Sequence, residues 1–284
     1  MSCPWNGNQT RLLIAMTKPN ARFDGSIPAT YDRYLGPLLF RPYAVDLAGR
    51  VRILAPRRVL EVACGTGILT SELAKVLPPG TQIVATDLND PMLAYAAERV
   101  PEAPIAWRQA DACALPFPGG AFDAVVCQFG VMFVPDKPLA FREARRVLTA
   151  GGHYFFSVWD TLDHNPLGRI AHDTIRSFFP DNPPDFYQLP FGFCDRSLIT
   201  RLLADAGFVG SSLFTVSLEG MSPSPLEVAT GLVKGNPVLT AIQERGTSSP
   251  DRIVTALAAA LELVAGPGPL RIPMQAIVVS ARAG

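Results

Sequence analysis

Two short motifs in the first third of the chain have the residue types and spacing to hold a nucleotide-like ligand. The first, Val59-Leu60-Glu61-Val62-Ala63-Cys64-Gly65-Thr66-Gly67, reads as a buried strand and a glycine turn, and Ile68 to Leu77 continues as a helix. A helix that begins at such a turn offers unpaired backbone N–H groups and the positive end of its dipole to an anionic group. The second motif, Gln82-Ile83-Val84-Ala85-Thr86-Asp87, is a strand that ends in an acid twenty positions after Gly67, the spacing of a carboxylate that binds ribose hydroxyls.

Departures from the dinucleotide-binding pattern indicate which nucleotide is bound. Thr70 replaces the third glycine of G-x-G-x-x-G, and Glu61 lies on the strand just before the turn. A carboxylate at that point would repel a pyrophosphate, but it suits a ligand that carries an amino group and a sulfonium cation. The chain also lacks a G-x-x-x-x-G-K-[ST] loop, which argues against ATP or GTP.

Several further motifs follow in the same order as in one known protein family. The chain resembles the class I S-adenosylmethionine-dependent methyltransferases, in particular the small-molecule group that includes the ubiquinone/menaquinone C-methyltransferases. Glu61 to Gly67 matches the first motif of that family, E/D-x-G-x-G-x-G, with Ala63 in the first glycine place. The resemblance covers roughly residues 30 to 160, and its other matching segments are Thr86-Asp87-Leu88-Asn89 with Met92, Gln109-Ala110-Asp111-Ala112, Leu115-Pro116-Phe117, Phe122 to Phe129, and Glu143 to Leu148 leading into Gly151-Gly152.

The resemblance implies a site for S-adenosylmethionine. Gly65, Thr66 and Gly67 would surround the methionine part with backbone N–H groups, and Glu61 would bind its amino group, directly or through water. Asp87 would accept hydrogen bonds from both ribose hydroxyls. The remaining implied residues are Ala63 in the turn, Leu88 and Met92 on either side of the adenine, Asp111 and Ala112 at the adenine edge, and Gln128 and Phe129 at the methionine end.

A methyl acceptor would bind where the connections after the strands meet. In open α/β sheets, ligands lie beyond the carboxyl ends of the strands, and residues 160–196 and 220–270 connect elements at or near that edge. Both segments are therefore predicted to form an acceptor lid, although an aromatic mini-core that only covers the sheet is the open alternative. The candidate acceptor-pocket residues are Tyr31, Tyr34, Trp159, Phe178 and Phe191.

Methyl transfer depends mainly on alignment, and a base is needed only when the acceptor must lose a proton. His164 and His172 lie in the first lid segment near Asp160 and Asp163, so they are the candidate catalytic bases. No metal site is predicted, because two histidines eight residues apart on a helix do not converge well on one ion.

Composition sets the class of protein and of partner. The 284 residues are 48% hydrophobic, and 25 Lys and Arg balance 25 Asp and Glu, so no overall charge favours nucleic acid. The longest apolar segment, 253–265, is shorter than the roughly 20 residues that span a bilayer, so no membrane insertion is expected. Five cysteines without a C-x-x-C pair indicate free thiols and a cytoplasmic location. The oligomeric state and the identity of the acceptor stay open.

The hydrophobic pattern predicts an α/β, Rossmann-like fold with a seven-stranded, mostly parallel sheet, helices on both faces and an inserted helical lid. The predicted division is an N-terminal arm with lead-in helices over 1–50, broken at Pro37 and Pro42, and a methyltransferase domain over 51–284. The predicted strands are 58–63, 82–87, 105–109, 122–128, 152–159, 211–219 and 274–281, and the predicted helices include 67–77, 90–99, 137–148 and 197–206.

The leading hypothesis is an S-adenosylmethionine-dependent methyltransferase for a small, apolar or aromatic acceptor. Two alternatives are a non-catalytic S-adenosylmethionine-binding module and a nicotinamide-dependent reductase of Rossmann type. Thr70 and Glu61 argue against the reductase.

Overall fold

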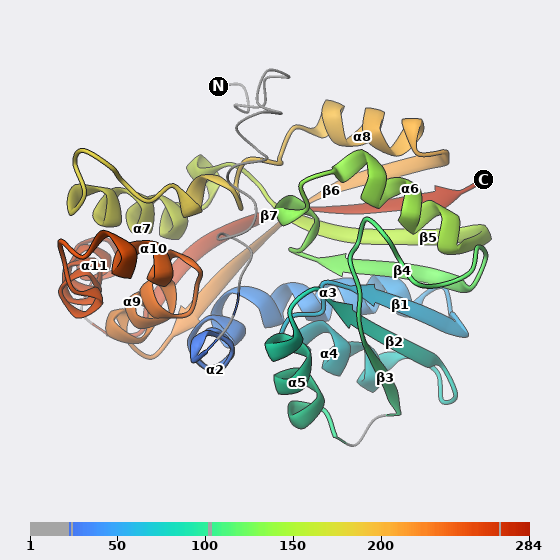
Figure 1. Cartoon of the computed structure of the whole chain (residues 1–284), viewed down its shortest axis with the longest axis horizontal. Coiled ribbons are helices and arrows are strands. Elements are labelled where there is room, and N and C mark those ends of the chain that lie inside the picture. Colours follow the sequence, from blue (N-terminus) through green and yellow to red (C-terminus); the bar gives the residue numbers. More distant parts are fainter. Residues whose placement is uncertain (1–22, 24, 102–103, 267) are drawn as a thin grey trace.

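The fold is centred on one seven-stranded sheet in a computed structural model that describes residues 23, 25–101, 104–266 and 268–284 (Figure 1). The strand order is β3-β2-β1-β4-β5-β7-β6. The bounds are β1 Arg58–Val62, β2 Gln82–Asp87, β3 Ile105–Gln109, β4 Phe122–Gln128, β5 Leu148–Trp159, β6 Phe208–Ser222 and β7 Leu270–Ala283.

The sheet is parallel except at one strand. β1 pairs in parallel with β2 and β4, β2 with β3, and β4 with β5, whereas β7 runs antiparallel to both β5 and β6. The Rossmann-like, mostly parallel sheet predicted from the hydrophobic pattern is therefore confirmed. The carboxyl ends of β1, β2, β4 and β5 consequently lie at one edge, where an open α/β sheet binds its ligands.

Helices cover both faces of the sheet. α6 and α8 lie on one face, and α3 and α4 lie on the other (Figure 1). The hydrophobic core between these layers includes fully buried side chains at Tyr43, Leu73, Phe141 and Phe156. The helix bounds in these layers are α3 Arg41–Arg52, α4 Ile68–Val76, α5 Asp90–Arg99, α6 Lys137–Val147 and α8 Arg196–Asp205.

The lead-in segment lacks the helix break that was predicted at Pro37. The helical run is not broken there, because Tyr31–Phe40 (η3) is a π-helix that accommodates Pro37 before α3 begins with Pro42 in its first turn. A proline lacks the N–H that an α-helix needs at that position, and a π-helix changes the hydrogen-bonding pattern locally. A short helix, α2 (Ile27–Thr30), precedes this segment, and the division of the chain at residue 50 stays a prediction.

A second group of helices lies beyond the carboxyl edge. The helices α7 (Pro166–Ser177), α9 (Pro225–Lys234), α10 (Val238–Arg245) and α11 (Pro250–Ala265) gather at that end of the sheet (Figure 1). α11 packs on both α7 and α9, and α9 packs on η3. A Cβ on Gly231 would lie 2.7 Å from Leu35 Cδ2, so α9 and η3 approach closely only because this residue is glycine.

The structure also bears on the expectations about the cysteines and about membrane insertion. Cys64, Cys113 and Cys127 are free, but Cys194 is in a disulfide, which contradicts the expectation of free thiols throughout; Cys3 lies outside the described residues. Among the described residues, none of the helices has the length and apolar character needed to cross a bilayer.

Candidate functional site

The glycine turn after β1 has the backbone conformation that its sequence predicts. Ala63, Gly65 and Gly67 all have positive φ, of 55°, 55° and 76°. Gly67 is the N-cap of α4 and no side chain caps that end, so the first turn of the helix keeps N–H groups for a ligand. The turn is held against β2, because Cys64 N donates to Thr86 O at 2.9 Å.

Asp87 joins the two predicted motifs. Its Oδ2 accepts from Gly65 N at 2.9 Å, and its Oδ1 accepts from Asn89 N at 2.8 Å. The carboxylate is buried, and burial raises its pKa, while the hydrogen bonds from Asn89 and Gly65 oppose that rise. Asn89 is also the N-cap of α5. The acid twenty positions after the turn is therefore in direct contact with that turn.

Glu61 is a buried carboxyl behind the same turn. Thr70 Oγ1 donates to Glu61 Oε2 at 2.6 Å, and the side chain is 1% exposed. Burial raises the pKa of Glu61 to about 8; the hydrogen bond from Thr70 opposes this, and Asp87 adds to it. Thr70, the residue that departs from the dinucleotide pattern, thus has a defined role as the partner of Glu61.

A cavity lies over the turn, and we call it the turn cavity. Its walls come from the end of β1, the turn, the start of α4 and η3, and its lining residues are Tyr31, Phe40, Glu61, Ala63, Cys64, Gly65, Thr66, Ile68, Leu69 and Gln128. Gln128 Nε2 donates to Phe40 O at 3.0 Å, whereas Gln128 Oε1 is buried without a hydrogen-bond partner among the described residues. An unpartnered oxygen and a nearby carboxyl suit a ligand with an ammonium group, so these residues fit S-adenosylmethionine.

A larger cavity adjoins the turn cavity, and we call it the aromatic cavity. Its empty space, including the open solvent at its mouth, is about 670 Å³. Tyr31 and Phe40, whose rings stack with centroids 4.7 Å apart, line both cavities and form their common wall. The other lining residues of the aromatic cavity are Phe23, Leu35, Leu39, Phe129, Met132, Phe133, Trp159, Asn165, Leu167, Gly168, Phe186, Tyr187, Pro190, Phe191, Leu232, Asn236, Pro273 and Met274.

The structure brings most of the predicted turn residues together, but not the predicted adenine contacts. Leu88 is 56% exposed, Met92 is buried on α5, and neither lines the turn cavity. Asp111 is exposed and accepts from Cys113 N at 2.8 Å, and Ala112 beside it lines a separate small hollow under β4. Asp87 is also absent from the lining. Burial raises the pKa of Tyr31, and the nearby Asp87 carboxylate adds to that rise.

The predicted acceptor residues divide into two groups. Tyr31, Trp159 and Phe191 line the aromatic cavity, and so does Phe129, whose ring stacks on Trp159 at 4.0 Å. Tyr34 and Phe178 do not line it. Tyr34 instead packs against Gly231 of α9, and Phe178 packs against the hydrophobic core.

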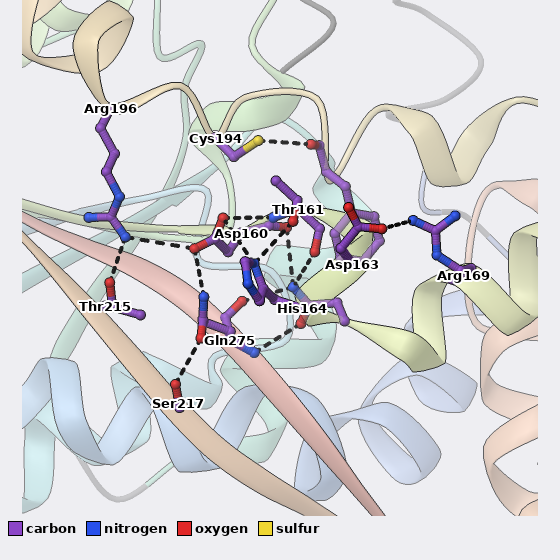
Figure 2. A network of polar contacts seen from close by, with 12 residues as sticks. Asp160, Thr161, Asp163, His164, Arg169, Cys194, Arg196, Thr215, Ser217 and Gln275 are labelled. Atoms are coloured by element: carbon purple, nitrogen blue, oxygen red, sulfur yellow. Dashed lines mark hydrogen bonds and ion pairs between the residues drawn. The ribbon is translucent and has the colours of Figure 1, made fainter. Parts of the chain in front are cut away.

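The two candidate bases lie outside the aromatic cavity. His164 belongs to a polar network around the buried Asp160 at the end of β5 (Figure 2). Its Nδ1 lies 3.1 Å from Thr161 Oγ1 and 3.9 Å from Asp160 Oδ1, and its side chain is 55% exposed. His172 lies on α7, where burial lowers its pKa and leaves Nδ1 without a partner among the described residues. Within the same residues, no cluster of three metal-ligating side chains occurs.

Asp32 is a residue of this region that the sequence reasoning missed. Asp32 of η3 accepts from Thr66 Oγ1 at 3.3 Å and from Tyr95 OH at 3.2 Å, and it pairs with Arg99 at 2.9 Å. It therefore ties η3 to the glycine turn and to α5 at once. No local motif marks it, because its partners lie far from it in the sequence.

Comparisons with known proteins agree with this geometry. A family model for a methyltransferase domain matches residues 60–156. The ubiquinone/menaquinone biosynthesis C-methyltransferase of Ectopseudomonas mendocina is 32% identical over 185 residues, which are 60% of this chain and 71% of that protein. The protein of the same name from Cellvibrio japonicus is 33% identical over 63% of this chain and 76% of its own length. The demethylmenaquinone methyltransferase of Thermus thermophilus is 44% identical over 40% of this chain and 51% of its own length.

Solved structures share the fold at low sequence identity. The YcgJ protein from Bacillus subtilis has a TM-score of 0.53 at 16% identity and covers 85% of this chain and 98% of its own. Phosphoethanolamine N-methyltransferase 2 of Haemonchus contortus, in complex with S-adenosylhomocysteine, has a TM-score of 0.56 at 17% identity over 90% of this chain and 56% of its own.

Fold and matches together define a class I methyltransferase. The chain belongs to the S-adenosylmethionine-dependent methyltransferase family, and it is an enzyme that transfers a methyl group from that cofactor to a small-molecule acceptor. The reductase and the non-catalytic binding module are not favoured.

Proposed function

We propose that this enzyme methylates a flat, apolar acceptor of the hydroquinone type, bound in the aromatic cavity. The observation that carries this proposal is the common wall of Tyr31 and Phe40, which sets an aromatic-lined space directly beside the turn cavity. The lining contains no charged side chain among the described residues, so it suits an uncharged ring better than a carboxylate or a phosphate. The relatives from E. mendocina and C. japonicus are named for methylation of ubiquinone and menaquinone precursors, which supports the same class of acceptor.

The residues of the turn would hold the cofactor. The free N–H groups at the start of α4 would bind its carboxylate, and Glu61 with Gln128 Oε1 would bind its amino group. Asp87 would bind the ribose hydroxyls in addition to Gly65 N and Asn89 N, because each carboxylate oxygen can accept more than one hydrogen bond. When bound, the cofactor supplies an electrophilic methyl group on a sulfonium. Leu88, Met92, Asp111 and Ala112 stay candidates for the adenine contacts.

The wall residues would align the two reactants. Methyl transfer is an in-line displacement, so Tyr31 and Phe40 would fix the ring of the acceptor against the methyl group and exclude water. Their negative ring faces would also stabilise the nearby cation. No histidine, carboxylate or lysine lines the aromatic cavity among the described residues. A ring carbon of an electron-rich hydroquinone can attack the methyl group as the S–CH3 bond breaks, and the proton at that carbon leaves to solvent only after transfer, so carbon is the proposed acceptor atom.

The test is a product analysis with the full chain. Purified protein is incubated with S-adenosylmethionine and 1,4-naphthohydroquinone under reducing conditions, and the products are identified by mass spectrometry and NMR. We expect S-adenosylhomocysteine and a ring-methylated naphthohydroquinone in equal amounts. Methylation of a panel of amines or carboxylates, with none of hydroquinones, would contradict the proposed acceptor. A cytoplasmic location and the absence of a nucleic-acid partner stay predictions.

A further inference from the structure

The aromatic cavity has very few polar side chains with which to orient a substrate. Among the described lining residues, the side chains with nitrogen- or oxygen-based hydrogen-bonding groups are those of Tyr31, Trp159, Asn165, Tyr187 and Asn236. A flat apolar ring can slide or turn over in such a cavity, since apolar contacts have little directional preference. The polar groups that remain free therefore decide which way round the acceptor binds.

Asn165 is held by hydrogen bonds from both ends of its amide to the backbone of the protein. Its Nδ2 lies within 3.2 Å of three backbone oxygens, those of Asp160, Thr161 and Gln275. Its Oδ1 accepts from Gln275 N at 3.0 Å. This side chain joins the end of β5 to β7, next to the network of Figure 2, and its role is structural.

Asn236 presents a different arrangement at the junction of α9 and α10. Its Nδ2 donates to Leu232 O at 3.2 Å and lies 3.5 Å from Tyr187 OH, and Tyr187 OH donates to Leu232 O at 2.7 Å. These contacts fix which atom of the amide is nitrogen, so the other atom, Oδ1, is the acceptor. Oδ1 has no hydrogen-bond donor among the described residues, and it is not one of the polar atoms that are fully buried without a partner. Asn236 is 7% exposed, and it lines the aromatic cavity.

Trp159 and Tyr31 are the other lining residues with a polar group that is open to a ligand, but the indole of Trp159 can only donate. Tyr31 is a neighbour of the α9–α10 junction, because its backbone lies against Gly235. It lies in the wall shared with the turn cavity, within electrostatic reach of Asp87 and Asp32. A hydroxyl that binds Tyr31 would therefore sit beside the cofactor. Asn236 belongs to the α9–α10 junction and not to this shared wall.

We infer that Asn236 is a specificity-determining residue, whose Oδ1 accepts a hydrogen bond from a hydroxyl of the methyl acceptor at the α9–α10 junction. The inference rests on the proposed function and names the group that this site requires, an aromatic ring with a hydroxyl that can donate. A ring without that donor would leave Oδ1 desolvated and unpaired, and such a loss weakens binding several-fold.

Binding without turnover tests the inference. The full chain, saturated with S-adenosylhomocysteine, is titrated in a calorimeter with 1-naphthol and with 1-methoxynaphthalene, which has the same ring but no hydroxyl donor. We expect wild type to bind 1-naphthol about five- to tenfold more tightly. Asn236→Leu, which keeps the size and removes the oxygen, should bind both compounds with equal affinity.

Two further variants keep the test decisive. If thermal unfolding shows that Asn236→Leu does not fold, Asn236→Ala takes its place. It too should bind both compounds with equal affinity. Tyr187→Phe removes the neighbouring hydroxyl but leaves Asn236 Oδ1, so it should retain the preference for 1-naphthol. Equal binding of both compounds by wild type, or a preference that survives in the Asn236 variants, overturns the inference. Discrimination by Asn236 without any methylation of hydroquinones would contradict the proposed function alone.

Discussion

The turn cavity and the aromatic cavity lie side by side, yet they are built in opposite ways. The turn cavity is formed mainly by one continuous stretch, residues 61–69, and its shape follows from positive-φ backbone and hydrogen bonds. The aromatic cavity is formed by side chains from segments between residues 23 and 274. A site made by local backbone geometry binds an invariant cofactor, whereas a site made by distant side chains can change with the acceptor. Each prediction below separates the two cavities by experiment.

The largest effect is expected for Asp87→Ala. This change removes the partner of Gly65 N and Asn89 N as well as the proposed ribose contact. We expect the affinity for S-adenosylmethionine to fall by roughly 1.5 to 3 kcal/mol, as measured by calorimetry. The affinity for 1-naphthol should stay within about twofold, because Asp87 does not line the aromatic cavity. An unchanged cofactor affinity would remove Asp87 from the site.

The second prediction concerns pH and Glu61. Its pKa of about 8 is above the ordinary value of 4.5, so the folded, cofactor-free protein keeps Glu61 protonated at neutral pH. The stability that comes from this protonation is fully present below pH 4.5 and is lost as the pH rises through 8. Glu61→Gln should therefore be more stable than wild type at pH 9, as measured by urea unfolding.

The same linkage predicts how cofactor binding changes with pH. A cationic ligand favours the ionised form of Glu61, so affinity for S-adenosylmethionine in wild type should rise by up to about tenfold between pH 7 and pH 8.5. Glu61→Gln is the matched control, because it removes this titration but not that of the cofactor. Parallel pH profiles of the two proteins would contradict an ionised Glu61 in the complex. Binding of 1-naphthol should not follow this profile.

Phe191→Ala should have the reverse effect of Asp87→Ala, because it changes the aromatic cavity and not the turn cavity. Phe191 lines the aromatic cavity near Trp159, with ring centroids 6.3 Å apart, and lines no part of the turn cavity. We expect 1-naphthol to bind several-fold more weakly, by about 1 kcal/mol, because one aromatic face of the pocket is lost. The affinity for S-adenosylhomocysteine should not change, and a parallel loss of both affinities would show that the two cavities are not independent.

The same contrast explains what could be predicted from the sequence. All seven strands were predicted within a few residues of their observed bounds. Buried strands such as β1 and β4 have continuous apolar patterns, and glycine turns have local signatures. The spacing of Asp87 from Gly67 predicted that the acid and the turn belong to one site, and the structure joins them through Gly65 N. Tyr34 and Phe178, predicted for the acceptor pocket, do not line the aromatic cavity, whereas Tyr187 and Asn236 line it and were not predicted. Nothing local in a sequence states which of many aromatic or amide side chains will converge from segments far apart.

Two glycine substitutions test how much the close packing of the turn on α5 contributes to the turn cavity. Gly67 and Gly80 both have positive φ, but a Cβ on Gly67 would lie 3.1 Å from Ala96 Cβ, whereas Gly80 has open space around it. Gly80→Ala should therefore cost only backbone strain, about 1 kcal/mol in the free energy of unfolding. Gly67→Ala should cost about 1 kcal/mol more and also weaken cofactor binding. Equal costs in urea unfolding would mean that the close packing of the turn on α5 is unimportant.

The smallest effect is expected for the double variant His164→Ala with His172→Ala. Neither histidine lines the aromatic cavity, and the exposed His164 contacts only the network around Asp160 (Figure 2). If a ring carbon accepts the methyl group, no base is required before transfer, so kcat for 1,4-naphthohydroquinone should change by less than about twofold. A fall of tenfold or more, with unchanged affinity for S-adenosylmethionine, would instead assign proton removal to one of these histidines. Such a result would also require the lid segment to move, because the present arrangement holds both imidazoles outside the cavity wall.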